Sequence, residues 1–370
     1  MNIELFLCLS LTPNNNSPVL LPKSNNFHPS GLFISLHRHP MFASKIKNKE
    51  SGILLYGITP PKAQNGIEKN AEVSGKRITQ IQPLPIDGLV IYDLQDESNR
   101  TPQERPFAFL ETVDPYVYAS EYLKELTLPK IIYRSVGKLS STELSSWISS
   151  IQQTDYATVF VGAPTREQVV QLKLTEAYQV WKQLNESCLL GGVTIPERHY
   201  TGRSEHKKIL DKMNSGCSFF ISQCVYSIGY TKNVLSDLYF HCQAQQVEMP
   251  TMIFTLTTCG SVKTIDFMSW LGIHLPIWLK NELTNCPDIL ARSVDLCVEI
   301  AEEIIEFCLA KSIPFGFNIE SVSIRKDEIE ASLYLLNKVD ELLRSNGLRT
   351  QTNDTPALAF TSEQTVLSEN

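Results

Sequence analysis

The chain has 370 residues, of which 42% are hydrophobic and 20% are charged, and its formal net charge is −7. This composition predicts a globular protein with a sizeable hydrophobic core, arranged either as one large domain or as two smaller ones. Because phosphate binding needs clustered positive charge and the chain has no dense Lys/Arg stripe, we expect no nucleic acid partner.

Nine cysteines, none of them in a CxxC pair, lie mostly among apolar neighbours. This pattern predicts buried, reduced thiols and a reducing compartment. No run approaches the roughly 18 consecutive apolar residues of a spanning helix. The first residues carry Glu4 in place of a basic leader, which argues against a signal peptide. We therefore expect a cytoplasmic protein with no membrane partner.

Two polar tails flank the patterned part of the chain. Residues 1–51 are rich in Asn, Ser, Pro and His, and we interpret them as a disordered or non-native N-terminal extension outside the fold. Residues 345–370 are interpreted as a disordered C-terminal tail, with Gly347 as a helix stop. The folded domain is expected to cover residues 52–344.

Apolar runs typical of buried strands alternate along this domain with amphipathic segments typical of helices. The expected strands are 53–58, 88–93, 130–135, 156–162, 189–195, 218–223, 251–256 and 315–320. The expected helices are 116–126, 140–153 with Glu143 placed to cap, 172–184, 204–213, 232–245, 289–311 and 325–343.

Eight strands, each followed by a helix, predict a closed (β/α)₈ TIM barrel. An open doubly wound sheet would need a GxGxxG turn after an early strand, and the chain has none. Barrel enzymes place their sites at the carboxyl ends of the strands, where this chain has polar residues but no cluster of metal-ligating residues. We therefore expect no metal.

Several short motifs in this order resemble one family. The first strand runs into paired prolines in LLYGITPPK, and the loop after the second strand ends in NRT (99–101). The fifth strand is followed by IPERH, and the sixth lies in SGCSFFISQCVY (215–226). Together they resemble the methylenetetrahydrofolate reductases, which are flavin-dependent (β/α)₈ barrels. The likeness extends from Gly52 to about Leu343.

The resemblance implies an activity in one-carbon metabolism and methionine biosynthesis. NAD(P)H would reduce bound FAD, and the flavin would reduce 5,10-methylenetetrahydrofolate to 5-methyltetrahydrofolate in a homo-oligomeric enzyme. The residues it implies at the flavin are His199 and Glu205, with Arg198 and Arg134 as phosphate partners, whereas Gln223 and Arg325 would bind the folate.

Each of these residues also has a simpler explanation. His199 and Arg198 suit a solvated loop, and Gln223 suits a strand end where it caps backbone groups. The resemblance favours the functional interpretation for His199 and Gln223, and it leaves Arg325 open between a folate contact and a surface residue at a helix start.

The chain departs from the family pattern at several sites. Gly57 replaces the acid at the end of the first strand, VGAPT (161–165) replaces Arg-Gly-Asp, and IIYRS replaces a third-strand histidine. In one hypothesis Asp93 or Asp96 supplies the catalytic acid, with a pKa raised by desolvation and by neighbouring acids.

Two alternatives stand beside that hypothesis. The acidic loop after the second strand is equally consistent with a solvated turn that positions Arg100 and Arg105. The barrel as a whole is also consistent with a protein that binds a folate or nucleotide without hydride transfer.

Overall fold

The structure is a computed structural model that describes residues 42–97, 101–151, 156–163, 168–184, 188–202 and 204–350. Eight parallel strands pair in chain order, and β8 pairs with β1, which closes the (β/α)₈ TIM barrel that the sequence predicts. The strands are β1 Ile53–Ile58, β2 Gly88–Ile91, β3 Lys130–Ser135, β4 Tyr156–Val161, β5 Leu190–Thr194, β6 Cys217–Cys224, β7 Thr251–Thr257 and β8 Phe315–Glu320.

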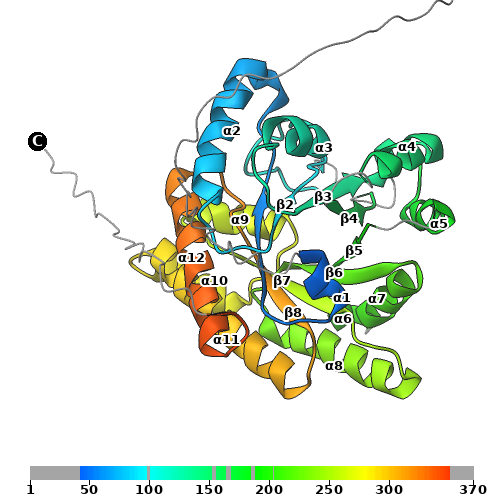
Figure 1. The fold of residues 1–370 in the computed structure, drawn as a ribbon. Coiled ribbons are helices and arrows are strands. Elements are labelled where there is room, and N and C mark those ends of the chain that lie inside the picture. The colour runs from blue at the N-terminus through cyan, green and yellow to red at the C-terminus, as the bar shows by residue number, and fades with distance from the viewer. Residues whose placement is uncertain are drawn as a thin grey trace, which may run out of the picture. The chain divides into compact units, whose positions relative to one another are not determined.

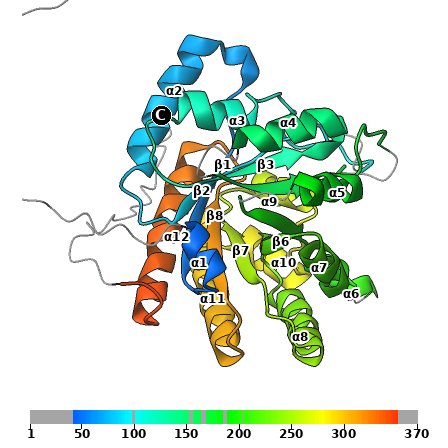
Figure 2. The same ribbon diagram turned by 45° about the vertical axis from the view of Figure 1, so that its right-hand side comes forward.

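Helices surround these strands, as Figures 1 and 2 show from two directions. Those that follow strands and cover the outside are α2 Ile67–Ile81, α4 Ser141–Ile151, α5 Leu174–Leu184, α7 Glu205–Asn214, α8 Ile228–Gln245, α11 Ile289–Ala310 and α12 Lys326–Ser345. Shorter helices are α1 Phe42–Lys47, α3 Pro115–Val117, α6 Glu197–Gly202, α9 Val262–Trp270 and α10 Ile277–Asn285. No helix among the described residues is long and apolar enough to cross a membrane.

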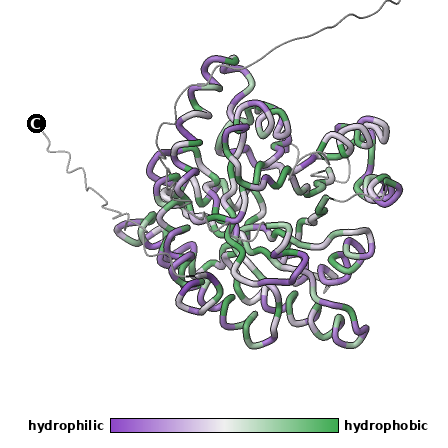
Figure 3. Tube along the Cα trace, in the orientation of Figure 1, coloured by the Kyte–Doolittle hydropathy of each residue, from purple (hydrophilic) through white to green (hydrophobic). Residues whose placement is uncertain are grey.

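The burial of hydrophobic side chains explains how the strands and helices are arranged. Strands of a parallel barrel are buried on both faces, so their residues are mainly apolar. β1 and β3 are buried at every position, including the charged residues Lys130 and Arg134 of β3. Figure 3 shows hydrophobic residues concentrated along the central strands, whereas the outer helices mix both kinds. In α11 the buried residues include Val294, Cys297 and Ile304, which form one apolar stripe that faces the barrel.

The N-terminus of α4 is capped as the sequence predicts. Ser140 donates its backbone N–H to the Glu143 carboxylate at 2.8 Å, and Glu143 donates its backbone N–H to the Ser140 hydroxyl at 3.2 Å. The segment 116–126 differs from the expected helix. It forms only α3, capped by Asp114, and a single π turn at Tyr118–Tyr122, and Tyr118 and Leu123 are buried in the core.

The N-terminal boundary expected at residue 52 is wrong by about ten residues. Helix α1 lies within the segment assigned to the extension, yet Phe42 and Ile46 are fully buried in the core inside the barrel. The Phe42 ring packs edge-on against Phe219 of β6 with ring centroids 5.3 Å apart. Strands enclose the sides of the barrel interior but leave its amino end open, so α1 supplies the side chains that close it.

The C-terminal boundary at residue 344 is wrong as well. Helix α12 continues to Ser345, and Arg349 is buried beyond it. The Arg349 guanidinium lies 2.6 Å from an Asp87 carboxylate oxygen and 2.7 Å from one of Asp340. Two acids buried near the amino ends of the strands require a cation, which the residues after the helix supply.

Candidate functional site

A cavity of about 360 Å³ lies at the carboxyl ends of the strands, where a barrel enzyme is expected to have its site. Residues from strand ends and from the loops that follow them form its wall. The polar and aromatic ones are Tyr92, Asp93, Gln95, Glu97, Tyr133, Phe160, Arg198, Lys212, Ser222, Gln223, Cys224, Thr255 and Glu320.

Glu320, the last residue of β8, is the most perturbed carboxyl group of this wall. Desolvation raises the pKa of Glu320 above its usual value, and hydrogen bonds from Tyr92, Cys224 and Asn318 oppose the rise. The Cys224 thiol donates to a carboxylate oxygen at 3.2 Å. A raised pKa favours the protonated form of this carboxyl group, which is able to donate a hydrogen bond or a proton to a ligand in the cavity.

This carboxyl stands next to the position where the sequence lacks an acid. Gly57 of β1 is the register partner of Glu320 across the β1–β8 ladder. A Cβ atom at Gly57 would lie 2.9 Å from the Tyr92 ring and 3.2 Å from Asn318 Oδ1, so Tyr92 occupies the space that a longer side chain would need. The acid absent from β1 is therefore matched by an acid on the neighbouring strand.

Gln223 lies on the cavity wall, as the resemblance implies for a residue that contacts the ligand. Its side-chain oxygen accepts the backbone N–H of Cys224 at 3.0 Å, and its amide nitrogen reaches the Leu271 carbonyl at 3.5 Å. The second contact is long, so the amide group keeps hydrogen-bonding capacity for a ligand. Its role in folate binding remains a prediction.

Two cations line the same cavity. Arg198 is exposed on α6, and Lys212 reaches in from α7, where its ammonium group donates to the Val193 carbonyl at 2.5 Å. Burial lowers the pKa of Lys212. With Glu320 on β8 across the barrel, the cavity has an acidic region and a basic region, which suits a ligand with a polar ring at one end and anionic groups at the other.

The two predicted catalytic acids are placed differently. Asp93 lies on the cavity wall, but its carboxylate accepts the Ser135 backbone N–H at 2.7 Å and lies 3.4 Å from the Lys138 ammonium. Asp96 is exposed and is not among the residues of the wall. Arg105 is half-buried, with its guanidinium 5.0 Å from the centre of the Trp270 ring, and desolvation lowers its pKa while Glu97 and Asp96 oppose this effect. Arg100 lies outside the described residues, so the solvated-turn alternative stays a prediction.

Three of the four residues expected to hold a flavin do not line the cavity. Glu205 is buried and accepts the Ile195 backbone N–H at 2.9 Å, so it fixes the exit of β5. His199 is buried with its Nε2 atom 3.2 Å from an Asp237 carboxylate oxygen. Only Arg198 reaches the cavity.

Arg134, the third of these, is buried on β3 away from the wall. Its guanidinium is 2.6 Å from an Asp114 carboxylate oxygen and lies 4.5 Å from the centre of the Trp147 ring. These contacts satisfy its charge within the protein. The residues implied by the resemblance therefore do not form one flavin-binding set in this structure.

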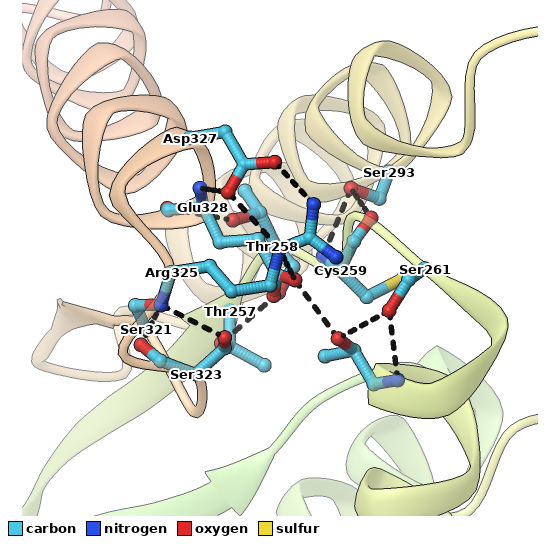
Figure 4. Close-up of polar contacts among 11 residues, drawn as sticks. Thr257, Thr258, Cys259, Ser261, Ser293, Ser321, Ser323, Arg325, Asp327 and Glu328 are labelled. Atoms are coloured by element: carbon cyan, nitrogen blue, oxygen red, sulfur yellow. Dashed lines mark hydrogen bonds and ion pairs between the residues drawn. The ribbon is translucent and has the colours of Figure 1, made fainter.

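Arg325 also lies away from the cavity wall, at the start of α12. Its exposed guanidinium pairs with Asp327 at 2.7 Å, and Figure 4 shows both beside Glu328, Thr258 and Ser323. Glu328 is buried and accepts the Thr264 hydroxyl at 2.8 Å. This cluster joins β7 to α12, and the surface alternative for Arg325 matches its position.

Glu197, which follows β5, is a second perturbed carboxyl near the site. Desolvation raises its pKa to about 7, and the neighbouring Glu205 adds to the rise. One carboxylate oxygen of Glu197 is buried without a hydrogen-bond partner among the described residues. We expect it to change charge near neutral pH.

Sequence reasoning placed Glu320 at a strand end but did not select it, and it missed Tyr92 and Lys212. The sequence could have identified Glu320 as a site residue, because it ends a buried strand at the expected edge of the sheet. Nothing in the sequence distinguishes Lys212, which lies in the last turn of a helix with several lysines. Only the packing of α7 against β5 and β6 turns its side chain inward.

No protein-family model and no curated protein matches this chain. Among solved structures, it is similar to a Clostridium thermocellum protein that binds two copies of 5-methyl-5,6,7,8-tetrahydrofolic acid. The two are 49% identical with a TM-score of 0.73, over 82% of this chain and 100% of that chain. It is also similar, at 11% identity and a TM-score of 0.35, to a 2,3-dimethylmalate lyase of the PEP mutase/isocitrate lyase superfamily, over 82% of this chain and 95% of that chain. This second likeness is too distant to bear on the site.

Proposed function

The chain belongs to the same protein family as the Clostridium thermocellum protein, and from this premise we propose that it binds a reduced folate of the 5-methyltetrahydrofolate type in the cavity at the barrel mouth. The observation that carries the proposal is the 49% identity over the whole of a relative that binds this ligand. The cavity volume of about 360 Å³ falls in the range of small-molecule sites.

The chemistry of the wall suits the two ends of such a ligand. The pterin ring presents amide-like donors and acceptors, which Gln223 and Glu320 are able to pair. The glutamyl end presents carboxylates, which suit Arg198 and Lys212. Tyr92, which is half-buried on the wall, adds an aromatic surface for the ring system. We expect the ring inside the cavity and the carboxylates near α6 and α7.

Titration of the purified full-length chain with 5-methyltetrahydrofolate, followed by calorimetry, tests this proposal. We expect saturable binding, and the measured stoichiometry can be compared with the two copies that the relative binds. Folic acid, whose pterin is fully oxidised, serves as the comparison ligand. Heat that never saturates, or equal weak binding of both compounds, would rule the proposal out.

Flavin-dependent reduction of 5,10-methylenetetrahydrofolate with FAD and NAD(P)H is a more specific prediction than folate binding. Membership of the reductase family depends on the same prediction. One observation favours it, since Glu320 stands opposite Gly57 as an acid for the methylene bridge. The placement of His199, Glu205 and Arg134 favours the other alternative, a barrel that binds folate without hydride transfer.

A visible spectrum of the purified protein separates these two alternatives. A flavoprotein is yellow, and added NAD(P)H bleaches its absorbance. We expect a colourless protein that binds folate and takes up no added FAD. A yellow protein bleached by NAD(P)H would instead establish the reductase.

A further inference from the structure

Two histidines and one aspartate from three different helices meet outside the folate cavity. His199 belongs to α6, His206 to α7 and Asp237 to α8, and one ligand atom of each lies within 4.8 Å of the others. His199 and His206 are 3% and 8% exposed, and Asp237 is half-buried. Such residues reach one point only because the three helices pack together, so this cluster is a product of the tertiary structure.

The spacing of the groups is that of ligands around one ion. Tetrahedral zinc, with bonds of about 2.0–2.1 Å, holds its ligand atoms about 3.3 Å apart. His199 Nε2 and the Asp237 oxygen are 3.2 Å apart. Two imidazoles on such an ion have ring centres separated by about 5 Å. The rings of His199 and His206 are 5.3 Å apart at an angle of 72°.

Two buried ring nitrogens in this cluster lack partners. The Nδ1 atoms of His199 and His206 have no hydrogen-bond partner in the part of the chain that the structure describes. A buried polar nitrogen is normally hydrogen-bonded or bound to a metal. The contact with Asp237 involves Nε2 of His199, the atom that would face an ion, so the unpartnered nitrogen that an ion could satisfy is Nδ1 of His206. The contact also does not explain the approach of this second imidazole.

We propose that His199, His206 and Asp237 form a binding site for a zinc ion, separate from the folate cavity. Imidazole and carboxylate ligands together suit zinc, whereas magnesium and calcium are held mainly by oxygen atoms. His241, one helical turn after Asp237, brings a third imidazole to the edge of the cluster, with its ring 6.1 Å from that of His206. A bound ion links α6, α7 and α8.

The site has a consequence for the barrel mouth. Arg198, the neighbour of His199, lines the cavity, so an ion bound to His199 also restrains this part of the wall. Metal binding does not require a folate, and the two sites are therefore testable one at a time.

The first experiment measures metal in the full-length chain, purified without a metal-affinity column. After brief dialysis we expect about one zinc per chain by elemental analysis, and a chelator should remove it and lower the unfolding temperature. Cobalt added to the metal-free protein should give the visible absorption bands of a four-coordinate site. Zinc near zero before and after addition, with no cobalt bands, would overturn the proposal.

The second experiment compares matched substitutions. We expect His206→Gln and Asp237→Asn each to weaken zinc binding about tenfold or more, because each removes one of three ligands. His274→Gln is the control, since His274 is exposed and its ring packs on Tyr230 outside the cluster. Circular dichroism without metal establishes that each variant is folded.

The results of these experiments distinguish a zinc site from a simple hydrogen bond between His199 and Asp237. Loss of zinc affinity in both ligand variants, with the control unchanged, supports the site. Equal zinc affinity in the wild type, both ligand variants and the control overturns it and leaves a His–Asp hydrogen bond only. If a ligand variant does not fold, the cobalt spectrum of the wild-type chain decides the question.

Discussion

Buried acidic residues have different partners at the two ends of the barrel. At the amino end, Asp87 is 2.7 Å from the Lys45 ammonium, 2.6 Å from the Arg349 guanidinium, and accepts the Leu54 backbone N–H at 2.8 Å. At the carboxyl end, Glu320 and Glu197 have carboxyl groups without a cation at hydrogen-bonding distance among the described residues.

This contrast indicates which end supports stability and which supports function. A buried acid with several cationic and backbone partners stabilises the fold, and it is costly to remove. An acid desolvated beside a cavity has a raised pKa and hydrogen-bonding capacity for a ligand. Substitutions at the amino end should therefore change the free energy of unfolding, and those at the carboxyl end should change ligand binding or pH dependence.

The largest effect is expected from Asp87→Asn. The change removes the carboxylate that pairs with Lys45 and one of the two acids that pair with Arg349, so the free energy of unfolding should fall by about 3–5 kcal/mol. Urea denaturation followed by circular dichroism measures it. Glu72→Gln, which removes only exposed pairs with Lys69 and Lys76, is the control and should leave the midpoint unchanged. Equal midpoints for the two variants would mean that the amino end is not a stabilising network.

Phe42→Ala tests whether α1 belongs to the fold. The side chain is 1% exposed and packs against Phe219, so its removal should cost about 3 kcal/mol through lost burial and the cavity left behind. The same denaturation measurement reports it. A variant as stable as the wild type would place residues 42–47 outside the fold, as the sequence alone suggested.

Glu197→Gln tests the charge at the carboxyl end through pH. Because the folded pKa of Glu197, about 7, is above the ordinary value of 4.5, the folded state retains a proton that the unfolded state loses, and wild-type stability falls as pH rises from about 4.5 to 7. The glutamine variant has no such loss. It should nearly match the wild type at pH 4.5 and be more stable by about 3 kcal/mol at pH 8. A pH-independent difference would contradict this account.

Gln223→Ala should have the smallest effect in energy and the most specific one. A lost amide contact in a buried site costs at least about 1.5 kcal/mol, so affinity for 5-methyltetrahydrofolate should fall more than tenfold while the unfolding midpoint stays constant. Calorimetry measures the affinity. Arg325→Ala, away from the cavity wall, is the control that should bind as the wild type does. Unchanged affinity in the Gln223 variant would remove this residue from the site.

The strands were the best predicted part of the fold. β1, β3 and β8 have the expected bounds because their apolar runs end at polar residues, and the other strands differ by at most two residues at an end. The helices α2, α9 and α10 were not expected, because their apolar positions are few or irregularly spaced and packing against the barrel stabilises them.

The sequence predicted the location of the candidate site but only some of the residues that line it. Gln223, Asp93 and Arg198 reach the cavity because they follow strands directly, and parallel strands bring their carboxyl ends to one edge. His199 also follows β5, yet its side chain turns toward α7 and α8, and Glu205 on α7 turns back to the backbone at the exit of β5. Whether a loop residue faces the cavity or a neighbouring helix depends on the helix packing, which one sequence does not reveal.

The order of apolar and polar residues determined by itself that this chain forms a (β/α)₈ barrel with a polar mouth, because strand and helix periodicity are local properties. Tertiary structure alone decided that Glu320 lies beside Gly57, that Arg349 meets Asp87, and that His199, His206 and Asp237 converge. These contacts join residues distant in the chain, and their geometry comes from closing the barrel and packing its helices.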